Sequence, residues 1–147
     1  MLAGPDARTA PVAAAVDGAV VAHISAHATV RAGSAPLSRI LLADGALYGY
    51  ELEAIPRPPR RVVLSTCDAA RGDVTSAGWP LGPATTLLGG GTATVIASVA
   101  PVHDEETAAF MVAVHRLMAA GTAPVHALAT VPRTPGVLGF NCLGAGS

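Results

Sequence analysis

Two short apolar runs rich in β-branched residues lie at residues 19–26 and 61–66. Runs of this length and composition are typical of strands buried in a parallel sheet. The first run is followed by His27 and the second ends at Cys67. Residues just past the carboxyl ends of parallel strands line the ligand crevice of an open sheet. Neighbouring strands would therefore place an imidazole and a thiol side by side.

The rest of the pattern alternates helices with strands, which indicates an α/β layer fold. We expect helices at residues 8–16, 48–55, 81–88, 104–120 and 124–130, strands at 38–42, 92–99 and 137–143, a turn at 43–45 and a loop at 71–78. In the helix at 104–120, Asp104 can act as the cap and Gly121 ends the helix. Its mostly apolar face is predicted to carry Ala109, Val112, Ala113, Arg116 and Leu117.

The composition suits one domain with a sizeable core, since 51% of the 147 residues are hydrophobic and 13% are charged. Such a balance fits a sheet buried on both faces, or an apolar surface covered by something outside this chain. The formal net charge is −1, and no basic stripe is present. Nucleic-acid binding needs clustered positive charge, so the sequence argues against it.

No targeting or membrane segment is predicted. The N-terminus has Asp6 before Arg8 and lacks a basic stretch followed by an apolar core, which argues against a secretory signal. The uncharged stretch at 74–102 is broken by prolines and by three glycines at 89–91, so its pieces are too short to span a bilayer. We expect a cytoplasmic protein without membrane contact. The glycines are predicted to form a turn, because phosphate-binding loops follow a strand and open a helix.

The strand-end pair has the chemistry of a cysteine nucleophile with a histidine base. The thiolate is the reactive form of cysteine, and a neighbouring imidazole lowers the pKa of the thiol. His27 and Cys67 are 40 positions apart. That spacing is comparable to the separation of about 50 residues in caspases.

Five segments carry a family resemblance: VAHISAH at 21–27, LLADG at 41–45, VVLSTCD at 62–68, ASVAPVHDEET at 97–107 and GFNCLGAG at 139–146. In this order they resemble the CHAT domain, a caspase-like cysteine peptidase domain. The resemblance implies a three-layer α/β/α fold around a mostly parallel sheet. It covers nearly the whole chain, but the family has more sheet before the histidine strand, so we expect a single partial domain, truncated on its N-terminal side.

The resemblance also implies roles for individual residues. Cys67 would be the nucleophile and His27 the general base and acid, with the backbone N–H groups of Ala28 and Cys67 forming the oxyanion hole. Asp68, Val102 and His103 are the candidate substrate contacts, although Asp68 could instead cap its turn. No cofactor is implied. The expected partners are a protein or peptide substrate, and an upstream sensor or repeat region or a complementary domain segment.

One departure from the family concerns the residue after the histidine, which is Ala28 here and usually glycine in the family. If the backbone there needs a positive φ, alanine would carry about 1 kcal/mol or more of strain. Two alternatives to the enzyme therefore stay open. One is an inactive CHAT remnant that acts as a protein-interaction module. The other is a ligand-binding α/β domain unrelated to peptidases.

For the remaining histidines and the second cysteine, the sequence predicts structural roles. His23 is predicted to be a core or supporting residue behind His27, and Cys142 a core residue. His115 and His126 are predicted to lie on the surface or in helix packing. A metal site formed by His23, His27 and Cys67 would suit zinc, but no fourth ligand occurs at a typical spacing. We therefore predict no metal.

Overall fold

The computed structural model describes residues 1–31, 33–66 and 82–147, and its centre is a four-stranded sheet. The strands are β1 (Val21–Ser25), β5 (Arg61–Ser65), β6 (Thr94–Ser98) and β7 (Phe140–Gly144), in the order β1-β5-β6-β7. β1, β5 and β6 run parallel, and β7 pairs antiparallel with β6. The predicted adjacency of the His27 and Cys67 strands is confirmed, because β1 pairs directly with β5.

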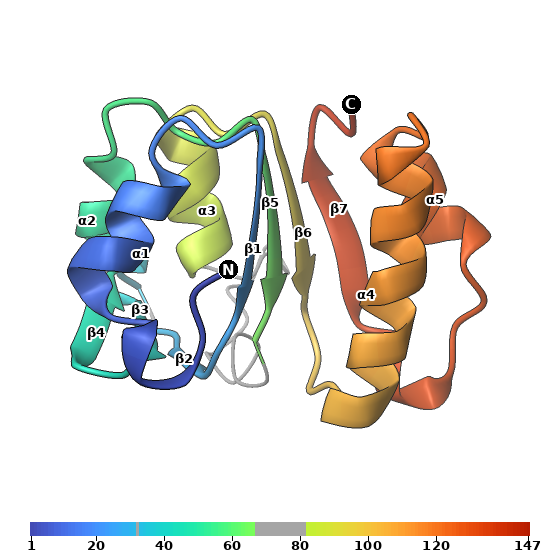
Figure 1. Ribbon diagram of the computed structural model, residues 1–147, viewed down its shortest axis with the longest axis horizontal. Coiled ribbons are helices and arrows are strands. Elements are labelled where there is room, and N and C mark those ends of the chain that lie inside the picture. Colours follow the sequence, from blue (N-terminus) through green and yellow to red (C-terminus); the bar gives the residue numbers. More distant parts are fainter. Residues whose placement is uncertain (32, 67–81) are drawn as a thin grey trace.

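Helices cover both faces of this sheet (Figure 1). One layer contains α1 (Thr9–Val16), α2 (Gly49–Glu53) and α3 (Pro83–Gly89), and the other contains α4 (Asp104–Ala119) and α5 (Pro124–Thr130). Successive strand residues point to opposite faces. Val62 and Leu64 accordingly belong to the core under α1–α3, whereas Val63 belongs to the core under α4 and α5. The predicted α/β fold with a mostly parallel sheet is confirmed.

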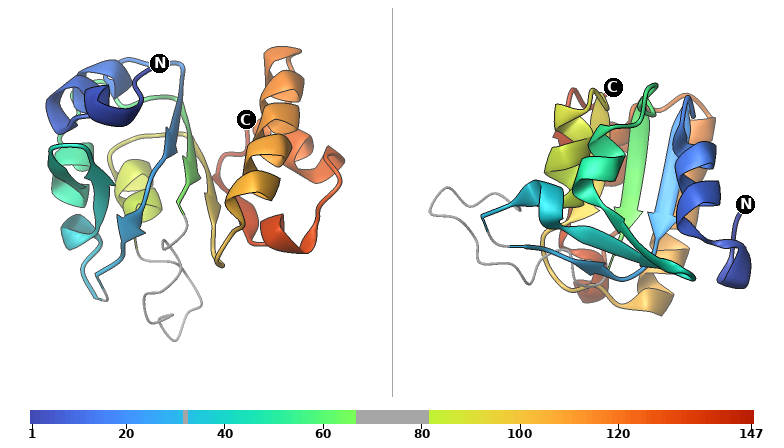
Figure 2. Two further views of the ribbon diagram at one scale, coloured as in Figure 1. Left: turned by 60° about the horizontal axis from the view of Figure 1, so that its bottom comes forward. Right: turned by 90° about the vertical axis from the view of Figure 1, so that its left-hand side faces the viewer.

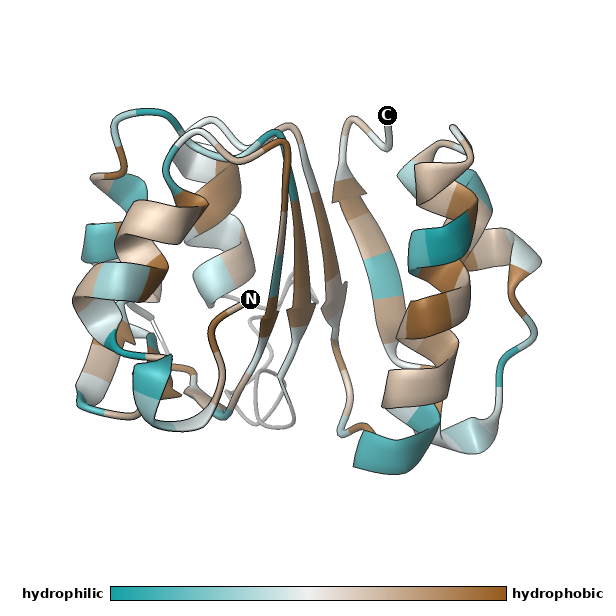
Figure 3. Cartoon of the chain, in the orientation of Figure 1, coloured by the Kyte–Doolittle hydropathy of each residue, from teal (hydrophilic) through white to brown (hydrophobic). Residues whose placement is uncertain are grey.

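The two central strands are buried on both faces, but β1 is buried on only one. Every residue of β6 and four of the five in β5 are buried, and Figure 3 shows both strands as largely hydrophobic. In β1, Ala22 and Ile24 are buried under α1–α3, while Val21, His23 and Ser25 remain exposed. The α4 side of β1 is therefore open, and polar side chains are tolerated there.

A second, antiparallel sheet consists of β2 (Ala28–Thr29), β3 (Arg39–Leu42) and β4 (Gly45–Tyr48). Figures 1 and 2 show it on the side of α1–α3. The sequence pattern predicts β3 and the turn at 43–45 but neither β2 nor β4. α2 begins at Gly49, where the N–H of Tyr48 donates to the Glu51 carboxylate at 2.8 Å. Short 3-10 turns occupy Gly4–Asp6 (η1), Ala35–Leu37 (η2) and Pro135–Val137 (η3), so the last strand begins at Phe140 and not at 137.

The long helix α4 matches its predicted bounds but differs in its cap and its buried face. The N-cap is His103, in extended conformation and without a side-chain cap bond, so the predicted capping role of Asp104 is wrong. Asp104 instead belongs to the first turn, where its negative charge interacts favourably with the positive end of the helix dipole. The buried residues are Thr107, Phe110, Met111 and Val114. Of the predicted apolar face, Ala113 and Leu117 pack against the core, whereas Ala109, Val112 and Arg116 are exposed, so that face is only partly correct.

Gly144 ends β7 with a positive φ of 87°. A Cβ at this position would overlap the carbonyl oxygen of Ala93. We expect Gly144→Ala to lower the free energy of unfolding by about 1–3 kcal/mol, because left-handed strain and the clash act together. Gly89→Ala is the control, since Gly89 is helical and a Cβ there meets nothing within 4 Å. Urea unfolding of both variants checks this, and equal stabilities would contradict it.

Candidate active site

A pocket of about 480 Å³ lies between β1 and α4, at the carboxyl ends of the parallel strands. Its volume is in the range typical of small-molecule and substrate sites. β1 and the residues after it contribute His23, Ser25, Ala26 and His27, β5 contributes Ser65, and the opposite wall comes from Val102 and α4. The pocket therefore occupies the uncovered side of β1, at the strand ends where the sequence predicts a crevice.

His27 lines this pocket, two residues after the end of β1, and is exposed to solvent. Its backbone carbonyl accepts a hydrogen bond from the N–H of Leu41 at 2.8 Å. β5 ends at Ser65, two positions before Cys67. Cys67 and Asp68 lie outside the described residues. The positions of β1, β5 and His27 are therefore observed, whereas the roles of Cys67 and Asp68 stay predictions.

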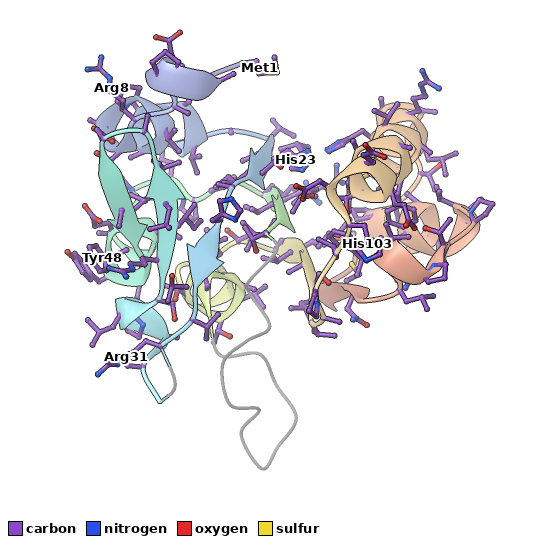
Figure 4. All side chains as sticks on the ribbon, turned by 90° about the horizontal axis from the view of Figure 1, so that it is seen from below. Met1, Arg8, His23, Arg31, Tyr48 and His103 are labelled. Carbon is purple, nitrogen blue, oxygen red and sulfur yellow. The ribbon has the colours of Figure 1, made fainter. Side chains whose placement is uncertain are left out.

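A hydrogen-bonded chain of three side chains also lines the pocket. Nε2 of His23 lies 2.9 Å from the hydroxyl of Ser65, and Nδ1 of His23 lies 3.0 Å from Nε2 of His115. The two rings are 4.9 Å apart between centroids and tilted by 30°. The chain links β5, β1 and α4 across the pocket. Figure 4, which views the carboxyl ends of β1, β5 and β6, shows His23 on β1.

Both histidines of the chain favour the neutral form. Desolvation, followed by repulsion from His115, lowers the pKa of His23 to about 4. Desolvation also lowers the pKa of His115. At neutral pH each ring then carries a single N–H, so one ring donates and the other accepts in the bond between them.

A family model for the CHAT domain matches residues 1–134 of the chain. The chain belongs to the CHAT domain family. This family is associated with a caspase-like cysteine peptidase fold, so the resemblance carried by the sequence motifs is confirmed. No curated protein matches the chain.

Ala28, the residue that departs from the CHAT pattern, fits its position without backbone strain. Among the described residues only glycines have positive φ. Ala28 opens β2, is buried and pairs with Ile40. Since His27 accepts from Leu41, these two residues form the hydrogen-bonded pair, and Ala28 belongs to the next, non-bonded pair. Its N–H therefore points away from β3.

The two substrate contacts predicted from the CHAT resemblance after β6 occupy different places. Val102 lines the same pocket as His27. His103 does not line it: its side chain is 70% exposed, and Nδ1 lies 3.0 Å from a carboxylate oxygen of Glu106. In Figure 4 His103 lies on the α4 side. Among these two, only Val102 shares the pocket with His27.

Glu106 fixes the start of α4 to the turn η3. Its carboxylate accepts hydrogen bonds from the hydroxyl of Thr134 and, at 3.1 Å, from the N–H of Gly136. The Thr134 bond first, then the bonds from His103 and Gly136, lower the pKa of Glu106. The carboxylate thus stays ionised, and its hydrogen bonds attach the first turn of α4, which follows Val102 in the pocket wall, to η3.

Three site residues escaped the sequence prediction: Ser65, His115 and Asp104, all of which line the pocket. The signal for the α4 residues is periodic, because positions 104, 108, 111 and 115 follow helical spacing and share one face. His115, predicted to lie on the surface or in helix packing, is partly exposed, packs its ring against His23 and also lines the pocket. Cys142 is half-buried against the core, and burial raises the pKa of its thiol.

The described residues contain no cluster of three or more histidines, cysteines or carboxylates arranged for a metal ion. They also contain no helix with the length and hydrophobicity needed to cross a bilayer.

The low pKa of His23 predicts an acid-sensitive stability. The folded value of about 4 lies below the unfolded value of 6.5, so the contribution is complete above pH 6.5 and is lost as the pH falls toward 4. The full shift would correspond to about 3 kcal/mol, and solvent screening at this partly exposed residue reduces it to about 1–2 kcal/mol. Urea unfolding at pH 7.5 and 4.5 should show a smaller loss for His23→Gln than for wild type.

His126→Gln is the matched control for this measurement, because His126 is exposed on α5, outside the pocket. It should lose as much stability between the two pH values as wild type does. A wild-type loss equal to that of His23→Gln would show that His23 takes up its proton without cost to the fold.

Proposed function

We propose that this CHAT domain is a cysteine endopeptidase in which Cys67 is the nucleophile and His27 the general base and acid. The observation that carries the proposal is the place of His27: it lines a pocket at the end of β1, directly beside β5, whose chain continues to Cys67. In a parallel sheet this edge is where ligands bind.

The chemistry follows from a thiol and an imidazole at such an edge. His27 takes the proton of the Cys67 thiol, and the thiolate attacks the carbonyl carbon of the scissile peptide bond. His27 then gives the proton to the departing amine, which leaves a thioester. Water, deprotonated by His27, hydrolyses the thioester and restores the thiol.

The negative oxygen of each tetrahedral intermediate needs preorganised donors. We assign this role to the backbone N–H groups of Ala28 and Cys67. The ordinary backbone conformation of Ala28 and the direction of its N–H, away from β3, support the assignment. Alanine in place of the usual glycine is thus compatible with activity.

Substrate binding is assigned to the pocket wall. Val102 offers an apolar contact in the pocket that His27 lines, and Asp68 follows the nucleophile directly in the sequence. His103 lies beyond the pocket, so it would meet only a peptide that continues over the start of α4.

An interaction module is the second candidate, and the edge position of β1 favours it. β1 is the terminal strand of the described sheet; its first residue, Val21, is 39% exposed, and Val20 directly before it is 68% exposed. An exposed edge can pair with a strand from another chain or segment. Hydrogen exchange at residues 19–25 over a dilution series separates the two: concentration-dependent protection supports pairing, and strong protection in a dilute monomer contradicts it.

Thiol labelling tests the peptidase proposal directly. Near pH 6, iodoacetamide should alkylate Cys67 at least about 10-fold faster than Cys142, because an adjacent imidazole stabilises one thiolate and burial disfavours the other. His27→Ala should slow labelling of Cys67 and leave Cys142 unchanged. Peptide mapping by mass spectrometry measures both rates. Equal, slow labelling of the two thiols would favour the inactive interaction module.

A further inference from the structure

The chain Ser65–His23–His115 has the connectivity of a nucleophile, a base and an orienting group. The hydroxyl contacts Nε2 of the central imidazole at 2.9 Å, and the third residue contacts Nδ1 of the same ring at 3.0 Å. Serine hydrolases recur on unrelated folds with this arrangement, one ring nitrogen for the nucleophile and the other for the orienting residue. Here the three residues come from β5, β1 and α4 and line one pocket.

We propose that Ser65, His23 and His115 form a serine acyl-transfer site that cleaves small, uncharged acyl esters. Ser65 and His23 are the catalytic residues, and His115 is a positioning residue because it acts through His23. The proposal does not rest on the cysteine peptidase function, since it uses neither Cys67 nor His27.

The reaction needs one tautomer of each ring. His23 carries its proton on Nδ1, which donates to the bare Nε2 of His115, and the lone pair on Nε2 of His23 accepts from the Ser65 hydroxyl. When Ser65 attacks the ester carbonyl, its proton passes to His23. The bond between the acyl carbon and the leaving oxygen breaks, and His23 protonates the leaving alkoxide to give an alcohol.

The second half of the reaction restores the enzyme. Water attacks the acyl-Ser65 ester and gives one proton to His23, which returns it to the Ser65 oxygen as the carboxylic acid leaves. The net change is ester plus water to acid plus alcohol, with no redox partner. The low pKa of His23 keeps Nε2 free to accept a proton at neutral pH, and a single proton can be shared by the two rings in the intermediate.

The pocket limits the substrate class. Its 480 Å³ suits a small ligand, and α4 provides an apolar wall with Ala108, Met111 and Val112. The described lining residues include no arginine or lysine that could pair with an anionic substrate, and Asp104 is their one carboxylate. A short-chain acyl ester fits these conditions, with its acyl group against α4 and its carbonyl at Ser65.

A matched serine gives the test its control. Ser25 lines the same pocket and pairs in register with Ser65, but of these two serines Ser65 is the one bonded to His23. The full chain is treated with an alkyl fluorophosphonate probe after its thiols are blocked with iodoacetamide, and the modified residue is found by mass spectrometry. Blocking the thiols keeps the outcome independent of whether Cys67 is active.

We expect the probe on Ser65, no labelling in Ser65→Ala, and labelling that still falls on Ser65 in Ser25→Ala. His23→Gln should slow labelling by about 100-fold or more, since a general base contributes at least that much. Hydrolysis of p-nitrophenyl acetate and butyrate should follow the same order. If folded protein takes up no probe, or if Ser65→Ala and Ser25→Ala label alike, the acyl-transfer site does not exist.

His115 needs a readout that a merely structural role would not move. His115→Phe removes a ring whose charge opposes protonation of His23, so the pH at which labelling reaches half its maximum should rise above about 4. It should stay below 6.5, because desolvation, the larger cause of the low pKa of His23, remains. His27 and Asp104, the other titratable groups lining the described pocket, are unchanged in this variant. A lower rate with an unmoved pH profile would mean that His115 only packs, and would overturn its assignment.

Discussion

Replacing His27 with alanine is expected to lower kcat/KM for peptide cleavage by about 100- to 10,000-fold, the range that general acid–base catalysis contributes. His27 lies at the pocket and its side chain makes no contact on which the core depends, since the residue is exposed. The loss should appear in kcat, because the imidazole acts on protons in the transition state and not on the bound peptide.

The measurement uses a peptide library read by mass spectrometry, with wild type and three variants. Cys67→Ala should remove cleavage entirely, and His27→Ala should leave at most a trace. His126→Ala, an exposed position on α5, should cleave as wild type does. Cleavage that survives Cys67→Ala, or a His27→Ala variant as active as the control, would exclude the proposed mechanism.

The strands that form this site could be read from the sequence because their surroundings are uniform. β5 and β6 are buried on both faces, so the three central positions of each strand are apolar, and this continuous apolar run identifies the strand. The sequence pattern predicts neither β2 nor β4. β2 has two residues and β4 has four, and each contains a single buried residue, Ala28 and Leu47, so neither forms an apolar run long enough to predict a strand.

The face of α4 was harder to predict because apolar residues surround the helix. The exposed Val112 is as apolar as the buried Val114, so the spacing of apolar residues alone does not show which face of α4 is buried. The actual direction is set by where the sheet lies. The same limit applies to His115, whose partner His23 is 92 positions away in the chain. No local pattern links the two rings, and only the packing of α4 against the open side of β1 brings them together.

Truncating Phe140 is expected to have the largest effect on stability. Phe140 is fully buried at the start of β7, where its ring stacks on Phe110 with centroids 5.8 Å apart. Phe140→Ala should lower the free energy of unfolding by about 3–5 kcal/mol, through lost burial and the cavity left beside α4. Domains of this kind have only about 5–15 kcal/mol in total, so the variant should unfold at much lower urea concentration.

Leu138 provides the control, because it lies two residues earlier and is 60% exposed. Leu138→Ala should change the free energy of unfolding by less than about 0.5 kcal/mol. If Phe140→Ala does not fold, Phe140→Leu should still fold and lose about 1–1.5 kcal/mol, since leucine fills part of the space. Urea unfolding followed by circular dichroism at pH 7.5 measures all three. A loss at Phe140→Ala no larger than that at Leu138→Ala would show that β7 does not pack against α4. In that case packing against β7 would not hold α4 in place as a wall of the pocket.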